Sequence, residues 1–300
     1  MFSRIVVPLD GSTLAERAIP LAREMADRSD GSIRLVRVHV PPRIPATCHQ
    51  VLGPRVGGEL KRSREAARAR DQQYLEEARK PAGEGEDEGP DVSTALLRGP
   101  EGHSVVDEVR RSDATLVVMS VPVPGRDEPD ELGAPRDTVV RGCPTPVLIV
   151  RTGDVPPGAA PAVPEHVLVP LDGTRRSEAV LKHATAVARL FDAPMTLIRV
   201  MRHDGRVEED RHDGEGDRSA ESYLEDLAEE LRHRGVEVDT HVGQGDPVAA
   251  ILEAARDRDT DLIAMASRCR GPLTRLVLGS VSDKVLRRTS ASVLVVNPTR

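Results

Sequence analysis

The sequence predicts an α/β fold with two tandem domains, each a five-stranded parallel sheet between layers of helices. Three observations lead to this prediction. Short apolar runs alternate with helical patterns along the chain, an order typical of parallel strands joined by right-handed crossovers. The 300 residues include two Phe, two Tyr and no Trp, so the cores are built from Val, Leu, Ile and Ala, as in buried parallel sheets. Four segments of the first half return in the same order in the second half, which indicates a duplication.

The repeated segments define the two domains. "RIVVPLDGSTLAERAIPLAREMA" at residues 4–26 returns as "HVLVPLDGTRRSEAVLKHATAVA" at residues 166–188. "SIRLVRVHV" returns as "PMTLIRVMR", "LLRGPEGHSVVDEVRRSDATLVVMS" as "HVGQGDPVAAILEAARDRDTDLIAMAS", and "RGCPTPVLIV" as "RTSASVLVV". Between the copies, a stretch rich in Pro, Ala and Gly is typical of a semi-rigid linker. We therefore predict domains at 1–152 and 165–300, joined by a linker at 153–164.

The elements of the second copy follow in order from hydrophobic periodicity and cap residues. Short apolar runs predict strands, and apolar residues at helical spacing predict helices. Asp246-Pro247 is a cap and first-turn signature. In chain order we expect a strand at Val167–Leu171, a helix at Ser177–Leu190, a strand at Met195–Val200, a helix at Tyr223–Arg234, an edge strand in "VEVDTHV", a helix in "DPVAAILEAARD" and buried strands in "DLIAMA" and "SVLVV".

Segments without periodicity predict loops. These are Pro41–Gly58, "PAGEGEDEGPD" and "RHDGRVEEDRHDGEGDRSAE". The last contains histidines and acids, but their spacing fits no metal-site template, and its glycines favour a solvated loop. We therefore predict no metal site there.

Composition excludes several classes of protein. A net charge of −7 and the scarcity of aromatic residues argue against nucleic-acid binding, which needs basic surfaces or stacking platforms. Cys48, Cys143 and Cys269 lie far apart, which suits a reducing compartment rather than a disulfide scaffold. No window approaches a membrane span, and the N-terminal apolar run is too short for a signal peptide. We expect a soluble, cytoplasmic protein without a membrane partner.

Ligands of open parallel sheets bind beside the carboxyl ends of the strands. In the second copy three segments converge there: the turn Pro170–Thr174, the region of Val200, and the loop from Ala266 to Ser280. Asp172 in the turn can accept hydrogen bonds from a ribose or an adenine amino group. It can equally cap the first helix or form an Asx-turn, and the sequence leaves both roles open.

The repeated "VPLDG[ST]" opening, the loop after the fourth strand and the closing "SVLVV" resemble the universal stress protein family in its tandem two-domain form. The resemblance covers nearly the whole chain and implies the Rossmann-like fold of the adenine nucleotide alpha hydrolases. The nucleotide-binding branch of that family carries G-x-x-G, nine residues, then G-[ST]. In the second copy this frame places Ala266 and Cys269 at the first two glycines and ends on Gly279-Ser280.

The second copy therefore keeps the spacing of the family pattern without its first two glycines. Ala266 adds one methyl group, whereas the Cys269 side chain can enter the space that a phosphate would fill. Arginines supply positive charge around the loop, and the helix start presents amides and hydroxyls to an anion; these residues are Arg268, Arg270, Arg275, Gly279, Ser280, Val281 and Ser282. Two alternatives stay open. Ser280 and Asp283 also form a capping-box pattern, and Cys269 between arginines has the surroundings of a redox-sensing thiol.

The first copy departs further from the family pattern. Its frame runs from Ser120 through Val123 to Gly133-Ala134, and the intervening "PGRDEPDEL" is acidic and contains two prolines. Acidic side chains repel a triphosphate, and Ala134 has no hydroxyl to offer it. We therefore predict that the first domain has lost phosphate binding.

The resemblance implies a regulatory stress-response protein that is not an enzyme and that binds ATP, with Mg²⁺, or a related adenine nucleotide in the second domain. Neither a G-x-S-x-G elbow nor a Walker A lysine loop is present. Under this hypothesis Asp172 and the backbone near Val200 hold the base and ribose. The other roles are phosphate steering by Arg268 and Arg270, phosphate binding by Gly279, Ser280 and Ser282, and completion of the site by Pro170, Gly173, Ala266, Cys269 and Val281.

The rival hypothesis is an interaction or dimerisation protein of the same fold that binds no nucleotide, and an ATPase is a weaker third. The Ala266/Cys269 pair separates the first two, because it decides whether the loop admits a phosphate. In the resembling family the last strands pair across a dimer axis. The resemblance therefore implies an intramolecular pseudo-dimer, with Pro146–Val150 antiparallel to Ser292–Val296, and allows a homodimer of chains.

Overall fold

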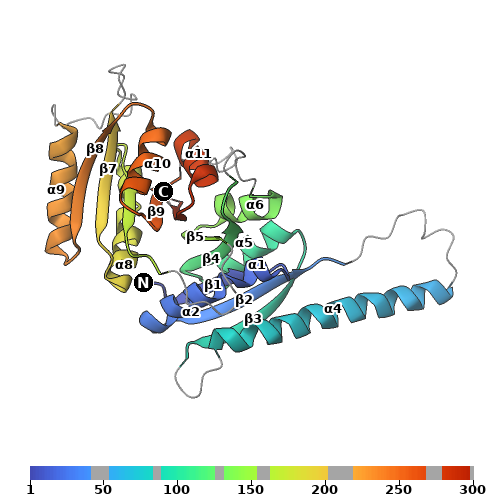
Figure 1. Ribbon diagram of the computed structural model, residues 1–300. Helices are drawn as coiled ribbons and strands as arrows, with labels where there is room; N and C mark the ends of the chain where they lie inside the picture. Colours follow the sequence, from blue (N-terminus) through green and yellow to red (C-terminus); the bar gives the residue numbers. More distant parts are fainter. Residues whose placement is uncertain are drawn as a thin grey trace.

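The structure is a computed structural model (Figure 1). It describes residues 1–41, 54–83, 89–125, 132–153, 163–201, 219–267 and 279–297. The predicted linker at 153–164, the acidic loop of the first domain and the loop with Arg268, Cys269 and Arg270 lie wholly or mostly outside these ranges.

The first domain alternates strands and helices, as the periodicity predicts. Buried Val, Ile and Leu fill its strands, and its helices bury one apolar face each. Its elements are β1 (Arg4–Pro8), α1 (Thr13–Glu16), α2 (Ile19–Arg28), β2 (Ser32–His39), α4 (Pro54–Gly83), β3 (Asp91–Arg98), α5 (Glu101–Arg111), β4 (Leu116–Pro122), α6 (Ala134–Gly142) and β5 (Val147–Thr152).

The second domain repeats this order. Its elements are β6 (Val167–Pro170), α7 (Arg175–Glu178), α8 (Leu181–Phe191), β7 (Met195–Met201), α9 (Ala220–His233), β8 (Val238–Gln244), α10 (Pro247–Asp257), β9 (Leu262–Ala266), α11 (Ser280–Arg288) and β10 (Ser292–Val296). The predicted cap of α10 is confirmed, since the Asp246 carboxylate accepts a hydrogen bond of 2.9 Å from the Ala249 amide.

The two five-stranded sheets join into one sheet of ten strands, in the order β3-β2-β1-β4-β5-β10-β9-β6-β7-β8. Within each domain all neighbouring strands are parallel. The junction is the antiparallel pair β5–β10, in which Ile149 faces Val293 and Val147 faces Val295. The predicted pairing of the last strands is confirmed, and it covers two edges that would otherwise be exposed.

Helices cover both faces of this sheet (Figure 1). One core lies beneath α2, α4, α8 and α9, and the other lies beneath α5, α6, α10 and α11. Each core is continuous across the domain junction, because strands of both domains contribute to it.

Side chains at equivalent positions near the ends of the two last strands hold the domains together through hydrogen bonds to backbone carbonyls. Asn297 follows β10 and donates its amide to the carbonyls of Val140, at 3.0 Å, and Cys143, at 2.8 Å, on the first domain. Arg151 of β5 donates to the carbonyl of Leu286 on the second domain. Since Val140 and Leu286 lie at corresponding places on α6 and α11, the junction has the self-complementary form of a two-fold interface.

The prediction of one helix at Ser177–Leu190 is wrong in one respect, because the segment forms two helices, α7 and α8. At the break the Val180 amide bonds the Ser177 carbonyl three residues back, at 3.3 Å, a tighter turn than the α-helix allows. The Ser177 hydroxyl also donates to the Thr174 carbonyl at 2.8 Å. The first domain breaks in the same way between α1 and α2.

The prediction of a loop at Pro41–Gly58 is wrong from Pro54 onward, because α4 begins there. This helix has 30 residues, and part of it extends beyond the sheet (Figure 1). Its outer residues lack an apolar stripe, and so hydrophobic periodicity does not detect its start. None of the helices in the described ranges has a stretch long and apolar enough to cross a bilayer.

His183 on α8 makes stability dependent on pH. Burial, reinforced by the charge of Lys182, lowers the pKa of His183 from 6.5 to about 4, and its Nδ1 has no partner among the described residues. The folded state therefore favours the neutral ring, and the stability this contributes is present above pH 6.5 and lost as pH falls toward 4. We expect His183→Gln to flatten the pH dependence of the urea midpoint between pH 6.5 and 4. An unchanged slope would contradict this assignment.

Candidate functional site

The turn after β6 holds Asp172 at the carboxyl end of the sheet. Its Oδ1 accepts hydrogen bonds from the Thr174 amide, at 3.0 Å, and the Thr174 hydroxyl, at 2.6 Å. Thr174 in turn caps α7 by accepting from the Ser177 amide at 3.2 Å. Asp172 therefore forms the Asx-turn that the sequence left as an alternative, and Thr174 rather than Asp172 is the helix cap. The side chain of Asp172 is exposed at the predicted site.

A cationic side chain lies directly beneath this turn. Gly173 has φ +86°, a conformation that favours glycine. A Cβ there would lie 3.0 Å from Nη2 of Arg199 and would press on that guanidinium. The Arg199 guanidinium stacks on the Tyr223 ring at 5.0 Å, and the Tyr223 hydroxyl donates to Glu178 at 2.9 Å. Burial, together with Glu178, raises the pKa of Tyr223.

The first domain repeats this cluster, which sequence reasoning missed. Arg37 stacks on Tyr74 at 4.7 Å and lies beneath Gly11, whose φ is +89°. Burial and Glu16 raise the pKa of Tyr74. The available signal was that Arg37 and Arg199 hold matching places in the repeats and that each copy has a single tyrosine further along the chain.

The end of β9 and the start of α11 form the rest of the predicted site. The Ser282 hydroxyl donates to the Ala266 carbonyl at 3.2 Å, so the two ends of the loop are brought together. Gly279 is the N-cap and is buried, and Ser280 is the first helical residue and is exposed. Val281 and Val200 are partly buried and pack against one core. The structure thus brings both segments to the same edge of the sheet as the Asp172 turn.

The capping box suggested for Ser280 and Asp283 is not formed, because α11 has no side-chain cap. Asp283 instead joins a cluster of four charged residues across the domain junction. It bonds Nη2 of Arg141 at 2.9 Å and Nε of Arg287 at 2.9 Å. Arg141 also bonds Asp137 at 2.7 Å, and Arg287 lies 4.0 Å from Asp137. Two cations thus offset the carboxylate in the first turn of α11.

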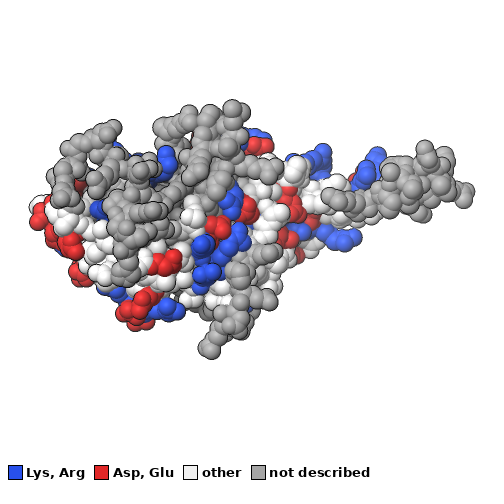
Figure 2. Space-filling model, turned by 90° about the horizontal axis from the view of Figure 1, so that it is seen from above, with Lys and Arg blue, Asp and Glu red and all other residues white. Residues whose placement is uncertain are grey.

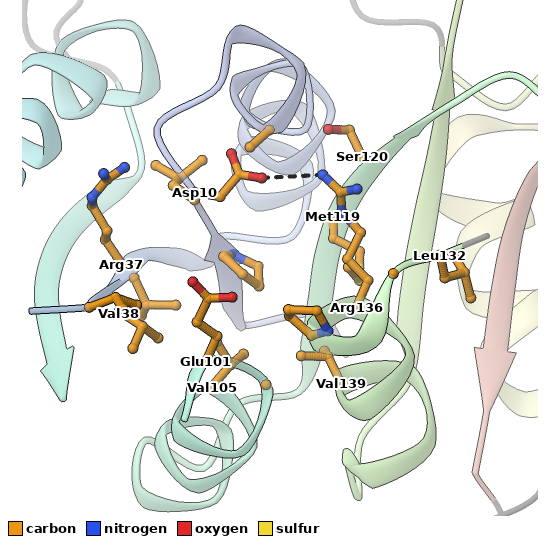
Figure 3. A pocket seen from close by; sticks show the side chains of 18 of the residues that line it. Asp10, Arg37, Val38, Glu101, Val105, Met119, Ser120, Leu132, Arg136 and Val139 are labelled. Carbon is orange, nitrogen blue, oxygen red and sulfur yellow. Dashed lines mark hydrogen bonds and ion pairs between the residues drawn. The ribbon is translucent and has the colours of Figure 1, made fainter. Parts of the chain in front are cut away.

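The first domain contains a pocket of about 340 Å³ at the carboxyl ends of β1, β2 and β4 (Figure 3). Its volume is within the range of small-molecule sites. Valines, Met119 and Leu132 line it, and Glu101 faces it from the start of α5. Arg136 of α6 reaches across to Asp10, 3.2 Å away. This pocket was not predicted from the sequence, because no sequence motif marks Arg136 as a partner of Asp10.

The Asp10–Arg136 pair lines that pocket. Burial tends to raise the pKa of Asp10, but hydrogen bonds from Ser12 and the charge of Arg136 outweigh it, so the pKa lies below its usual value. Asp10 is therefore ionised at neutral pH, and Arg136 is engaged by it. Ala134 is the first residue of α6 and offers no hydroxyl.

The comparisons with known proteins agree with this architecture. A family model described as the universal stress protein family matches residues 1–151 and 164–297. A universal stress protein of Mycolicibacterium smegmatis is 27% identical over 303 residues, covering 98% of this chain and 97% of that protein. Universal stress protein MJ0531 of Methanocaldococcus jannaschii is 31% identical over 137 residues, covering 43% of this chain and 80% of that protein.

Solved structures show the same fold over the full length. A universal stress protein from Archaeoglobus fulgidus superimposes with a TM-score of 0.70 at 18% identity, covering 99% of both chains. A putative universal stress protein from Pseudomonas aeruginosa gives a TM-score of 0.60 at 17% identity, covering 99% of this chain and 94% of the other. With two matching family segments, a shared fold and one strand pair joining the halves, the chain belongs to the universal stress protein family in its tandem two-domain form.

Proposed function

We propose that this protein is a regulatory stress-response protein that binds ATP, with Mg²⁺, or a related adenine nucleotide in its second domain, without efficient catalysis. The observation that carries the proposal is the start of α11. Ser280 is exposed there, next to the buried Gly279, and Ser282 ties this helix start to the end of β9. Helix starts of this kind bind phosphate. Asp283, the carboxylate in the first turn of this helix, is held by two arginines and so repels an anion less.

The remaining roles follow the sequence hypothesis. Asp172 and the backbone near Val200 hold the ribose and base, and Pro170 and Gly173 shape the turn. Arg268 and Arg270 steer the phosphates. Bound nucleotide would then change the surface that this edge of the domain offers to a partner.

A matched pair of substitutions tests this proposal. Ser280→Asp and Ala134→Asp each place a carboxylate at the exposed first residue of equivalent helices, where an acid favours the helix. We expect Ser280→Asp to weaken nucleotide binding about 100-fold by repulsion of the phosphates, and Ala134→Asp to leave it unchanged. Displacement of a fluorescent ATP analogue measures both.

Equal losses in the two variants would place the nucleotide elsewhere, and the absence of any displacement would favour the rival hypothesis. A specific observation supports that rival. The Ser282 hydroxyl and Asp172 Oδ1 already form hydrogen bonds within the protein, as in a fold that serves dimerisation or partner docking. The Ser282 hydroxyl is not required to bind the phosphates if backbone amides do so.

A further inference from the structure

The outer part of α4 concentrates positive charge on a protein that is acidic as a whole. Residues 61–70, here called the basic arm, carry five basic side chains and one acidic one, Glu65. The arm thus has a net charge of +4, whereas the chain has −7. The basic residues are Lys61, Arg62, Arg64, Arg68 and Arg70.

The arm lies beyond the part of α4 that packs on the sheet. Packing begins at Asp71, which bonds Arg37 at 2.7 Å and His39 at 2.7 Å, and continues through the buried Leu75 and Ala78. Every residue of the arm is exposed except Ala67, which is half-buried. Figure 1 shows α4 projecting past the domain, and Figure 2 shows Lys and Arg side chains toward this end of the molecule.

The charge surrounds the arm instead of lying along one side. With about 100° between successive residues, Lys61, Arg64 and Arg68 share one side of the helix. Arg62 and Arg70 then point roughly 100° and 180° away from Lys61. Alanines are the only apolar residues of the arm. An apolar stripe is needed both for docking in a protein groove and for insertion into a membrane surface.

A helix with cations on several sides fits a groove with anions on both walls. The major groove of duplex DNA is about 12 Å wide, and a helix with its side chains measures about 10–12 Å across. Both walls of the groove carry phosphates, and arginine binds phosphate with two parallel hydrogen bonds. A flat acidic surface or a lipid headgroup layer would meet only one side of the arm.

The acidic body does not cancel this charge. Lys61 lies ten residues beyond Asp71, a helical rise of about 15 Å, which is roughly two screening lengths at physiological salt. The whole-chain charge that argued against nucleic acid therefore averages over the acidic body and the outer arm from Lys61 to Arg64, which lies more than one screening length from Asp71. We infer that the basic arm binds the major groove of duplex DNA through its phosphates, without reading the base sequence.

Fluorescence anisotropy with a labelled duplex of about 20 base pairs tests this inference on the full chain. With four net charges engaged, we expect saturable binding at 50 mM salt and a loss of about 100-fold in affinity between 50 and 200 mM. Duplex RNA should bind more weakly, because its major groove is too narrow for a helix. A single strand should bind more weakly as well, since the arm has no aromatic side chain for stacking.

Two triple variants with the same net charge separate the arm from the rest of the surface. Arg64→Gln/Arg68→Gln/Arg70→Gln should lower affinity at 50 mM salt at least about 30-fold and reduce the salt slope by about 3. Arg189→Gln/Arg256→Gln/Arg288→Gln removes three exposed arginines of the second domain and should change affinity less than about twofold. Circular dichroism checks that both variants keep their helices, which glutamine supports well.

Several results would overturn the inference. They are no saturable binding at 50 mM salt, equal losses in the two variants, or equal binding of duplex RNA. Binding to phosphatidylserine vesicles that duplex DNA does not displace would assign the arm to membranes. Displacement of the duplex by polyglutamate at equal charge would assign it to acidic proteins.

Discussion

Replacing Asn297 with alanine is expected to lower the free energy of unfolding by about 3–4 kcal/mol. The side chain is 8% exposed and bonds the carbonyls of Val140 and Cys143 in the other domain. Its Oδ1 also accepts from the Ser267 hydroxyl at 2.5 Å. The substitution takes the Asn297 donor away from two buried carbonyls and removes one hydrogen bond of Ser267. A buried polar group left without a partner costs about 1–3 kcal/mol.

Urea denaturation followed by circular dichroism measures this change. Gln73→Ala is the control, because Gln73 is an exposed amide on α4 that bonds only Glu77 among the described residues, at 2.9 Å. It should shift stability by less than about 0.5 kcal/mol. A loss below about 1 kcal/mol for Asn297→Ala would show that the domain junction does not depend on this residue.

Arg141→Gln should lower the affinity of the second domain for ATP about tenfold, although Arg141 belongs to the first domain. The substitution removes one of the two cations that hold Asp283. The carboxylate then faces the phosphates with less compensation, in the first turn of α11. A tenfold change corresponds to about 1.4 kcal/mol, which is reasonable for a partly exposed charge near a protein surface.

A double-mutant cycle separates this electrostatic effect from simple disruption of the junction. Asp283→Asn in the Arg141→Gln background removes the repulsive charge and should restore affinity to within about twofold of the original. Arg79→Gln, on an exposed part of α4, controls for the loss of one positive charge. Unchanged affinity in Arg141→Gln, or no rescue in the double variant, would contradict the account.

Periodicity was sufficient to predict the layers and most strands, because buried parallel strands are short apolar runs. The repeat then predicted the second domain from the first. The β5–β10 pairing came from the family resemblance and is confirmed. Periodicity failed in two places. At the Ser177–Val180 break, local hydrogen bonds interrupt the helix. In the outer part of α4, the residues have no apolar stripe from which a helix could be predicted.

The candidate site was less predictable than the fold. For Asp172, a ligand role and a role in the turn had equal support from the sequence, and the Thr174 contacts show the turn role. Arg141 and Asp283 are 142 residues apart, so no sequence window joins them. Arg136 and the first-domain pocket depend on how α6 is placed against β1, which spacing alone does not determine.

Isothermal titration of the full chain with ATP and Mg²⁺ decides whether the second domain binds nucleotide. We expect saturable heat with one nucleotide per chain, because the second domain keeps Gly279-Ser280 and the first has Ala134 at the equivalent helix start. Two nucleotides per chain would contradict the loss of phosphate binding in the first domain. No heat at millimolar ATP would contradict nucleotide binding altogether and leave the fold as a platform for protein partners.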